Sequence, residues 1–194
     1  MSEPAYKNPW LFVGNFLMPQ TSVILIDESN FYFKLKDLGL DNQLNFNFQK
    51  FTTHIAAKHK NISTIYYIGA VRTKTDFHTR KLHAKQQKLF KYLSSQNIKY
   101  SLGYLLESNG VMHEKGVDIQ IAVDMLINSY ENRIDRIILI SSDTDLIPAI
   151  KQVQKLGKQV TYVGFKHKPS RALINICSDY VLLSRRDLDE FYLF

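Results

Sequence analysis

The chain has 194 residues, 45% of them hydrophobic, so it can bury one sizeable core and is most simply a single domain. Lysine and arginine outnumber aspartate and glutamate by 25 to 18, which gives a net charge of +7 and a pI near 9.3. This balance favours nucleic acid or another polyanion as a partner, although an ordinary solvated basic surface is the alternative that charge alone leaves open.

Cysteine content and hydropathy exclude several other classes. The single cysteine, Cys177, rules out an intramolecular disulfide and a cysteine-rich zinc site, and we expect it to be a small core residue of a cytoplasmic protein. No apolar run approaches the roughly 18 residues that a membrane helix needs. Residues 1–20 also lack the basic start of a signal peptide, so we expect no membrane partner.

The first 20 residues differ in character from the rest of the chain, and we expect them to form an arm that precedes a domain at residues 21–194. Three prolines make a regular element unfavourable there. The arm also carries several large apolar side chains: Trp10, Leu11, Phe12 and Phe16. We expect it to dock on the domain or on a second subunit, and the second case would produce a homo-oligomer.

From residue 21 onward, apolar runs alternate with amphipathic segments. The runs expected to be β-strands are 21–27, 62–71, 98–106, 136–140, 159–165 and 180–183. The segments expected to be helices are 29–38, 46–59, 78–95, 115–130, 144–156, 170–176 and the last residues. The Asn109-Gly110 dipeptide predicts a small hairpin that ends near Val111. The alternation predicts one α/β domain, whose mainly parallel sheet of five or six strands is covered by helices on both faces.

Four aspartates stand where this arrangement delivers side chains to one edge of the sheet. Asp27 ends the first strand, and Asp143 and Asp145 follow the 136–140 strand. Asp118 lies in the first turn of the helix that leads into that strand. In open α/β sheets, ligands bind outside the carboxyl ends of the strands near the switch in strand order. Four acids there can hold one Mg²⁺, or two ions about 3.5–4 Å apart.

Each of these residues also has a structural explanation. Asp143 can cap the following helix, and Asp118 and Asp145 can be acids of a first helical turn, where the helix dipole favours them. Asp27 gains little as a cap, because another acid follows it. Asn30 can hydrogen-bond a phosphate oxygen or a water of the metal site, or it can cap its helix. The coincidence of four acids at one edge favours a metal site.

Neighbouring positions exclude related sites. Asp124 is six positions beyond Asp118, about 240° around a helix, so we assign it to a supporting or surface position. A haloacid-dehalogenase-type phosphatase needs a second aspartate where Ser29 stands, and an integrin-type metal motif needs serine where Phe31 stands. The first strand is not followed by a glycine-rich phosphate loop, which disfavours nucleotide binding of the Rossmann or P-loop type.

Basic residues gather in two segments expected to flank the acids. The first segment follows the second strand, the other follows the fifth, and their basic residues are Arg72, Lys74, Arg80, Lys81, Lys85, Lys166, Lys168 and Arg171. We expect them to neutralise phosphates on either side of a bound scissile bond. Phe77, His78 and Phe165 are expected to stack on unpaired bases. For the lysines of the 78–95 helix, a solvated helix face is the alternative.

Three motifs together resemble the NYN domain, the LabA-like branch of the PIN-like nucleases. They are VILIDESN at 23–30, EKGVDIQIAVDML at 114–126 and RIILISSDTDLIPAIKQVQKLGKQVTYVGF at 136–165, in the family's order. The resemblance covers about residues 23–183 and implies a Rossmann-like (PIN-like) three-layer α/β/α sandwich. It also implies a Mg²⁺- or Mn²⁺-dependent ribonuclease site at Asp27, Asn30, Asp118, Asp143 and Asp145. Glu28 and Ser142 depart from the family, which usually has glycine at both positions.

The residues and the resemblance together predict a metal-dependent endoribonuclease that acts on single-stranded or structured RNA. Asp27, Asp118, Asp143 and Asp145 are expected to bind Mg²⁺ or Mn²⁺ and to position a water for attack on phosphorus. The alternative is a non-catalytic RNA-binding or regulatory protein that keeps the pocket. A hydrolase of small phosphates is disfavoured by the large basic flanks.

Overall fold

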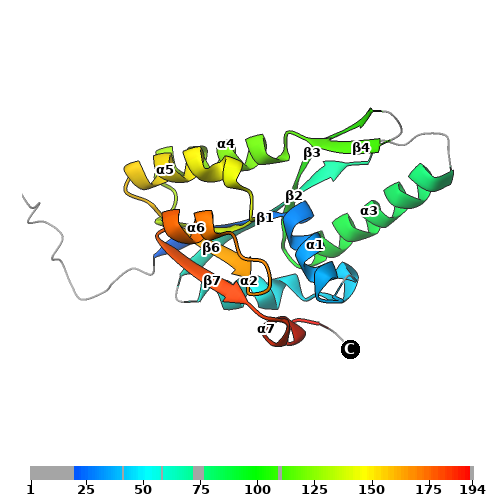
Figure 1. The fold of residues 1–194 in the computed structure, drawn as a ribbon, viewed down its shortest axis with the longest axis horizontal. Coiled ribbons are helices and arrows are strands. Elements are labelled where there is room, and N and C mark those ends of the chain that lie inside the picture. Colours follow the sequence, from blue (N-terminus) through cyan, green and yellow to red (C-terminus); the bar gives the residue numbers. More distant parts are fainter. Residues whose placement is uncertain (1–19, 41, 58, 72–76, 109–110, 193–194) are drawn as a thin grey trace, which may run out of the picture.

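A computed structural model describes residues 20–40, 42–57, 59–71, 77–108 and 111–192, without the side chains of 77–78 and 104–115. The strands are β1 (Thr21–Asp27), β2 (Lys60–Ala70), β3 (Lys99–Ser108), β4 (Val111–Lys115), β5 (Arg136–Ile140), β6 (Gln159–Phe165) and β7 (Asp179–Leu183). The α-helices are α1 (Glu28–Asp37), α2 (Phe48–Ala56), α3 (Phe77–Ser95), α4 (Val117–Tyr130), α5 (Ile147–Lys155), α6 (Arg171–Ile176) and α7 (Arg185–Asp189). Two 3₁₀ turns, η2 (Gln43–Asn45) and η3 (Thr144–Leu146), complete the described elements (Figure 1).

The strands form one sheet in the order β4-β3-β2-β1-β5-β6-β7. All neighbouring pairs are parallel except β3 and β4, which form an antiparallel hairpin at one edge. The expected Rossmann-like α/β sandwich is therefore confirmed. The sheet has seven strands rather than five or six, because both halves of the hairpin join it. The short β4 sequence, VMHEK, carries no apolar run that would identify it as a strand.

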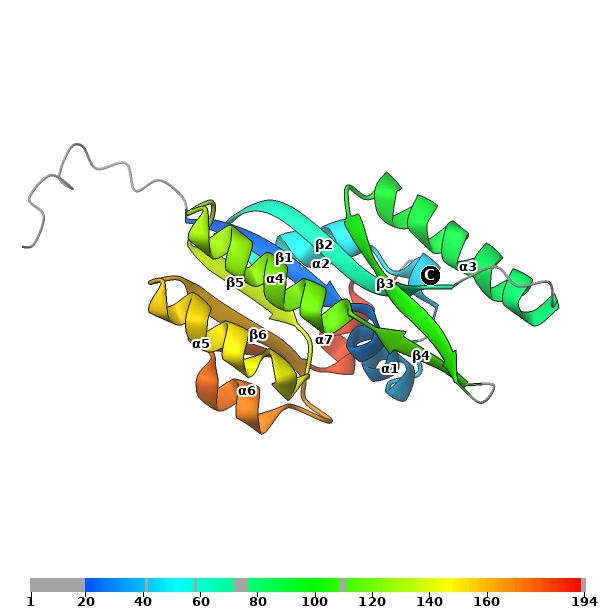
Figure 2. The ribbon, with the colours of Figure 1, turned by 90° about the horizontal axis from the view of Figure 1, so that it is seen from above.

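The helices cover the two faces of the sheet and bury two separate apolar clusters (Figures 1 and 2). Helices α1, α2, α3 and α7 contribute to one cluster, and α4, α5 and α6 contribute to the other. Strand β1 alternates between them, with Ile24 and Ile26 in the first and Val23 and Leu25 in the second. A strand buried on both faces is typically apolar at successive positions, which explains the apolar run at residues 23–26.

Aromatic rings fill much of the first cluster. Phe46 lies edge-on to the rings of Phe48, Phe51 and Phe31, with centroid distances of 4.9, 5.1 and 5.4 Å. Edge-to-face pairs of this kind contribute about 0.5–1.5 kcal/mol each beyond the area that they bury. Phe31 belongs to the first helix after Asp27, so this packing holds α1 against the sheet beside the candidate site.

Helix α4 has two apolar faces, and the sheet buries only one of them. The buried side chains are Val117, Ile121 and Met125, which belong to the second cluster. Ile119, Val123 and Ile127 form the other face, and these side chains are 70%, 41% and 44% exposed. Both sets repeat every four residues, so spacing alone does not distinguish them.

Candidate active site

Asp27 ends β1 with a carboxylate that is almost fully buried, at 2% exposed. Its Oδ1 accepts a hydrogen bond from the backbone N–H of Asn30 at 3.2 Å. Its Oδ2 accepts from Asn30 Nδ2 at 2.5 Å and from Ser141 Oγ at 2.8 Å. A buried charge needs such donors to offset the loss of water. Asp27 therefore caps α1 and also ties the end of β1 to the residue that follows β5.

The side chain of Asn30 joins the two central strand ends. Its Nδ2 donates to Asp27, while its Oδ1 accepts a hydrogen bond from the backbone N–H of Ser142 at 3.2 Å. Asp27 is the last residue of β1 and Ser142 follows β5, and these two strands are neighbours in the sheet. Asn30 thus links the ends of β1 and β5 at the point where the strand order switches. This link was not predicted from the sequence.

Asp143 and Asp145 lie at the start of η3, directly after β5. Asp143 Oδ1 accepts from the backbone N–H of Asp145 at 2.8 Å, and the Asp143 N–H donates to Ser141 Oγ at 3.1 Å. The capping role that the sequence analysis weighed for Asp143 is therefore present. The side chain of Asp145 is exposed. Ser141 connects this turn to Asp27, so the two strand ends form one hydrogen-bonded unit.

Asp118 approaches the same edge from the first turn of α4. Gly116, two residues before Asp118, is the N-cap of α4. Its backbone is left-handed, with φ of 83°, and this conformation lets the helix begin directly after β4. Helix α4 contacts η3, the turn that carries Asp143 and Asp145. Partial burial is the largest cause that raises the pKa of Asp118. The remaining causes are the negative charges of nearby acids: Asp27, Asp143 and Asp145. Asp27, Asp143 and Asp145 therefore lie near enough to Asp118 for their negative charges to disfavour its ionisation.

The carboxylates fit Mg²⁺ or Mn²⁺ by chemistry, although they are not arranged as a finished metal cage. Among the described residues, no three His, Cys, Asp or Glu side chains form a group ready to hold a metal ion. The oxygens of Asp27 and Asp143 instead accept hydrogen bonds from the protein. Mg²⁺ commonly takes only one or two carboxylates directly and completes its octahedron with water and phosphate oxygens. A divalent cation would also offset the repulsion that raises the pKa of Asp118.

Asp124 supports the sheet under α4 rather than facing the cluster. Its Oδ2 accepts from Tyr67 Oη at 2.6 Å and its Oδ1 accepts from Gln120 Nε2 at 2.9 Å. Tyr67 is paired with Asp27 across β1 and β2. Burial, followed by the hydrogen bond to Asp124, raises the pKa of Tyr67 well above its ordinary value, so the phenol stays a neutral donor. This position agrees with the supporting role that helix geometry assigned to Asp124.

The two departures from the family pattern fit the local backbone. Glu28 is the first residue of α1, and Ser142 lies between β5 and η3. Among the residues that the structure describes, neither has the positive φ that would require glycine. The hydroxyl of Ser142 lies 3.5 Å from Tyr162 Oη, so its side chain has a polar neighbour.

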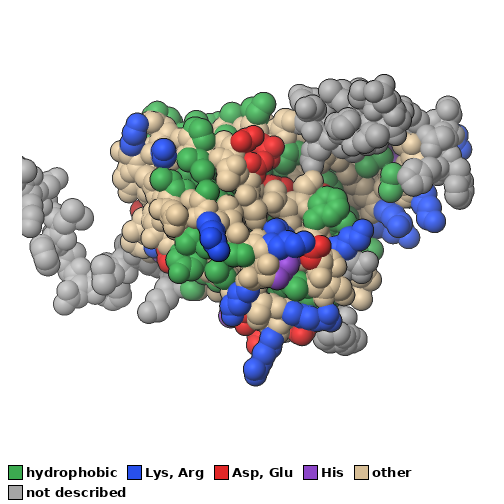
Figure 3. Space-filling view, in the orientation of Figure 1, with side chains coloured by type: hydrophobic (Ala, Val, Ile, Leu, Met, Phe, Trp, Pro, Cys, Tyr) green, Lys and Arg blue, Asp and Glu red, His purple; other side chains and the backbone are tan. Residues whose placement is uncertain are grey.

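The predicted basic residues have different surroundings. Lys166 Nζ lies 3.7 Å from Asp187, and Lys168 Nζ lies 2.7 Å from Asp37. Such exposed pairs contribute at most about 1 kcal/mol, so phosphate can replace the partner. Arg171 begins α6 and is exposed. Figure 3 shows lysine and arginine side chains on the same face as a group of acidic ones.

The other predicted basic residues are on or before α3. Arg80 and Lys81 are exposed on this helix, and neither forms an ion pair with another described residue. Arg72 and Lys74 lie outside the described residues.

The exposed aromatic ring nearest in sequence to Asn30 was not among the residues predicted to stack on bases. Phe165 was expected to stack on bases, but it is 2% exposed and packs 6.0 Å from the Phe31 ring, so that expectation is wrong. The side chains of Phe77 and His78 lie outside the described residues. Phe33 is 59% exposed and follows Asn30 by three residues on α1, which places both on one side of the helix. This spacing of three residues in the sequence could have indicated that Phe33 lies near Asn30.

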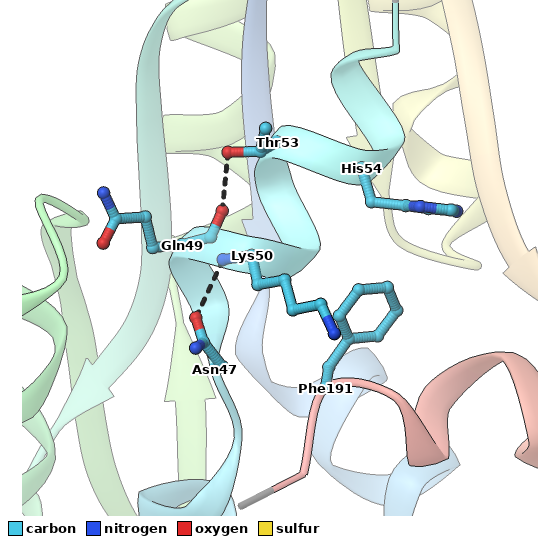
Figure 4. Close-up of a pocket in the computed structure, with 6 residues that line it drawn as sticks. All are labelled: Asn47, Gln49, Lys50, Thr53, His54 and Phe191. Carbon is cyan, nitrogen blue, oxygen red and sulfur yellow. Dashed lines mark hydrogen bonds between the residues drawn. The ribbon is translucent and has the colours of Figure 1, made fainter.

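A separate hollow of about 520 Å³ lies between α2 and the residues after α7. Its lining consists of Asn47, Gln49, Lys50, Thr53, His54 and Phe191 (Figure 4). Lys50 Nζ donates to the carbonyl of Glu190 at 2.9 Å and lies 5.7 Å from the centre of the Phe191 ring. No carboxylate belongs to this lining, so the hollow is distinct from the acidic cluster.

A mainly parallel sheet with acids gathered at its switch point defines a Rossmann-like α/β protein with a candidate acidic site. The family model of the NYN domain matches residues 21–184, and the chain belongs to this nuclease-like, PIN-like family. The expected family is thus confirmed.

Two similar proteins carry names that leave their activities open. The uncharacterized protein MJ0482 of Methanocaldococcus jannaschii is 38% identical over 66 residues, which cover 34% of this chain and 27% of that protein. The crystal structure of VPA0982, a protein of unknown function from Vibrio parahaemolyticus, superposes with a TM-score of 0.66 at 22% identity. That match covers 90% of this chain and 97% of the other, and it shows the fold alone.

Proposed function

We propose that this protein is a cytoplasmic, metal-dependent endoribonuclease that hydrolyses RNA phosphodiester bonds at the acidic cluster. The observation that carries the proposal is the bridge formed by Asn30, which accepts from Ser142 and donates to Asp27. It joins the ends of β1 and β5 at the switch in strand order, where α/β proteins bind ligands. Membership of the nuclease-like NYN family supports the same conclusion.

The acids would have different roles at the metal site, depending on how exposed each side chain is. Asp118 and Asp145 are exposed and would contact the metal directly, while the buried Asp27 is oriented by Asn30 and Ser141. A bound Mg²⁺ or Mn²⁺ would supply charge neutralisation at the scissile phosphate and activation of a water. Asn30 and Ser141 join the ends of β1 and β5, and this would hold the carboxylates in position relative to the scissile phosphate.

The surface beside α1 fits RNA with unpaired nucleotides. Phe33 offers an exposed ring one helical turn from Asn30. The next residue, Lys34, donates to the carbonyl of Lys168 at 2.9 Å, which places the lysine-bearing loop after β6 against the same helix. An aromatic ring beside cations is the arrangement that binds single strands, by stacking on bases and neutralising phosphates. We therefore propose that the bases next to the cleaved bond are unpaired.

A second candidate function is RNA binding without cleavage, as a regulatory protein. Both oxygens of Asp27 already accept hydrogen bonds, and Asp143 caps η3. Metal binding would have to compete with these contacts. A protein that keeps the basic and aromatic surface but not a working metal site would bind RNA and leave it intact.

The deciding experiment is cleavage of a labelled RNA containing single-stranded and hairpin segments, with Mn²⁺ or Mg²⁺. We expect cleavage in either metal, and loss of at least about 100-fold in EDTA or in Asp143→Asn, because metal ions supply several kcal/mol of transition-state stabilisation. Asp179→Asn, an exposed acid on β7, is the matched control and should cleave normally. Cleavage that survives EDTA and Asp143→Asn would exclude the metal mechanism. RNA binding without turnover in either metal would support the second candidate.

A further inference from the structure

The face of α4 that points away from the sheet carries a row of large apolar side chains. We call this row the α4 stripe, and its members are Ile119 (70% exposed), Val123 (41%), Ile127 (44%) and Tyr130 (62%). Their spacing of four, four and three residues puts them on one side of the helix. Single exposed apolar residues are normal, but a continuous row of four marks a surface that another segment covers. Hydrophobic side chains also line the upper part of the face shown in Figure 3, where Figure 1 places α4 and α5.

The chain enters the domain beside one end of this stripe. The N–H of Thr21, at the start of β1, donates to Asp135 Oδ2 at 2.8 Å, and Asp135 N–H donates back to the Thr21 carbonyl at 3.0 Å. Thr21 Oγ1 also lies 3.5 Å from the carbonyl of Arg133, which is three residues after the end of α4. Figure 2 shows the start of β1 beside the end of α4. Thr21, and with it the point where residues 1–19 join the domain, therefore lies near the C-terminal end of α4, which carries Tyr130.

The apolar part of this arm is long enough to cover the stripe and has the same apolar character. Residues 10–17 read WLFVGNFL, with six large apolar side chains in eight positions. Eight extended residues span about 26 Å, and the stripe from residue 119 to residue 130 spans about 16 Å along the helix. Residues 18–20 add about 10 Å, enough for the chain to turn onto α4. The arm can therefore reach the whole stripe from its point of attachment.

We propose that residues 10–17 dock along the α4 stripe of the same chain, running from Tyr130 toward Ile119. A tether of a few residues gives a millimolar effective concentration, which favours this intramolecular contact over a second copy at micromolar protein. Ile119 is the neighbour of Asp118 in the sequence, so the docked end of the arm lies at the rim of the acidic cluster. This inference does not depend on the cluster being catalytic.

Trp10 is the only tryptophan in the chain, so its fluorescence reports on the arm alone. In the full-length protein we expect blue-shifted emission and acrylamide quenching several-fold weaker than in the denatured protein. The double variant Val123→Ser, Ile127→Ser should shift the emission to the red and restore strong quenching, with an unchanged circular dichroism spectrum. Val181→Ser, on the exposed side of β7, is the matched control and should change neither signal.

The outcomes separate the occupants of the stripe. Solvent-like Trp10 emission in the wild type, or emission that the stripe variant leaves unchanged, would overturn the proposal. Quenching that depends on protein concentration, together with a dimer in light scattering that the stripe variant abolishes, would assign the stripe to a second copy and overturn intramolecular docking. Protection that is independent of concentration in a monomer, and is lost in the stripe variant, is the result that we expect.

Discussion

Two aspartates at opposite ends of the central strands have opposite electrostatic surroundings. Asp135 stands before β5, and its Oδ2 accepts from the N–H of Thr21 at 2.8 Å and from Thr21 Oγ1 at 3.0 Å. The backbone hydrogen bond from Thr21 is the largest cause that lowers the pKa of Asp135. Asp118, at the carboxyl edge, has its pKa raised by partial burial and by three neighbouring negative charges.

The difference separates an acid whose surroundings favour its charged form from one whose surroundings disfavour it. Asp135 is given donors that favour its charged form, so its ionisation contributes to folding. Asp118 is held among like charges, which costs stability. Perturbation of this kind is concentrated at functional sites, where a ligand relieves it. The comparison therefore predicts opposite results when each charge is removed.

The largest expected effect follows from replacing Asp118. In Asp118→Asn, RNA cleavage should fall at least about 100-fold, because a carboxylate that would contact the metal is lost. The free energy of unfolding, measured by urea denaturation, should stay the same or rise, because a like-charge repulsion is removed. A variant that loses stability but keeps its activity would reverse the distinction drawn between the two acids.

A smaller effect, on both stability and activity, is expected at Asn30. Asn30→Ala removes the hydrogen bond to the buried Asp27 and leaves the N–H of Ser142 without its acceptor. Such losses cost about 1–3 kcal/mol of unfolding free energy. Cleavage should fall as well, since the ends of β1 and β5 would no longer be joined. Asn42→Ala, which removes the exposed cap of η2, provides a control that should cost less. Equal costs in the two variants would count against the bridge.

The smallest effect is expected at Asp135, and it depends on pH. Because the folded pKa is lowered, the stabilisation is present above the unfolded aspartate pKa of about 3.9 and is lost as the pH falls through the folded value. Asp135→Asn should therefore lower the unfolding free energy at pH 7 by less than about 1 kcal/mol, since the side chain is exposed. The difference from wild type should shrink below pH 4, and cleavage should not change. A difference that grows with acidity would mean that the donors of Thr21 do not favour the charged form.

Buried strands were the part of the fold most accessible from the sequence. The bounds of β1, β5 and β6 were predicted as observed, because strands covered on both faces leave continuous apolar runs. Strand β4 lacks such a run and was not counted in the sheet. The packing face of α4 is not evident from the sequence, since two sets of residues with the same spacing compete and only the position of the sheet decides between them.

Some features of the candidate site could likewise be predicted from the sequence, and others could not. Strand ends and helix starts indicated the positions of the four acids, because topology brings those ends together. The hydrogen bond from Ser141 to Asp27 joins residues 114 positions apart and leaves no local pattern. Phe165 is buried because β6 is covered on both faces up to its last residue, where the ring packs against Phe31 of α1, a contact between residues far apart in the sequence.

The most direct test of the contrast between the two acids is the unfolding midpoint as a function of Mn²⁺ concentration. We expect Mn²⁺ to raise the midpoint of the wild type and of Asp135→Asn by similar amounts, because an ion that binds only the folded state stabilises it. Asp118→Asn should show little or no increase. An absence of any Mn²⁺ effect on the wild type, or an equal increase in all three proteins, would contradict the assignment of the acidic cluster as a metal site.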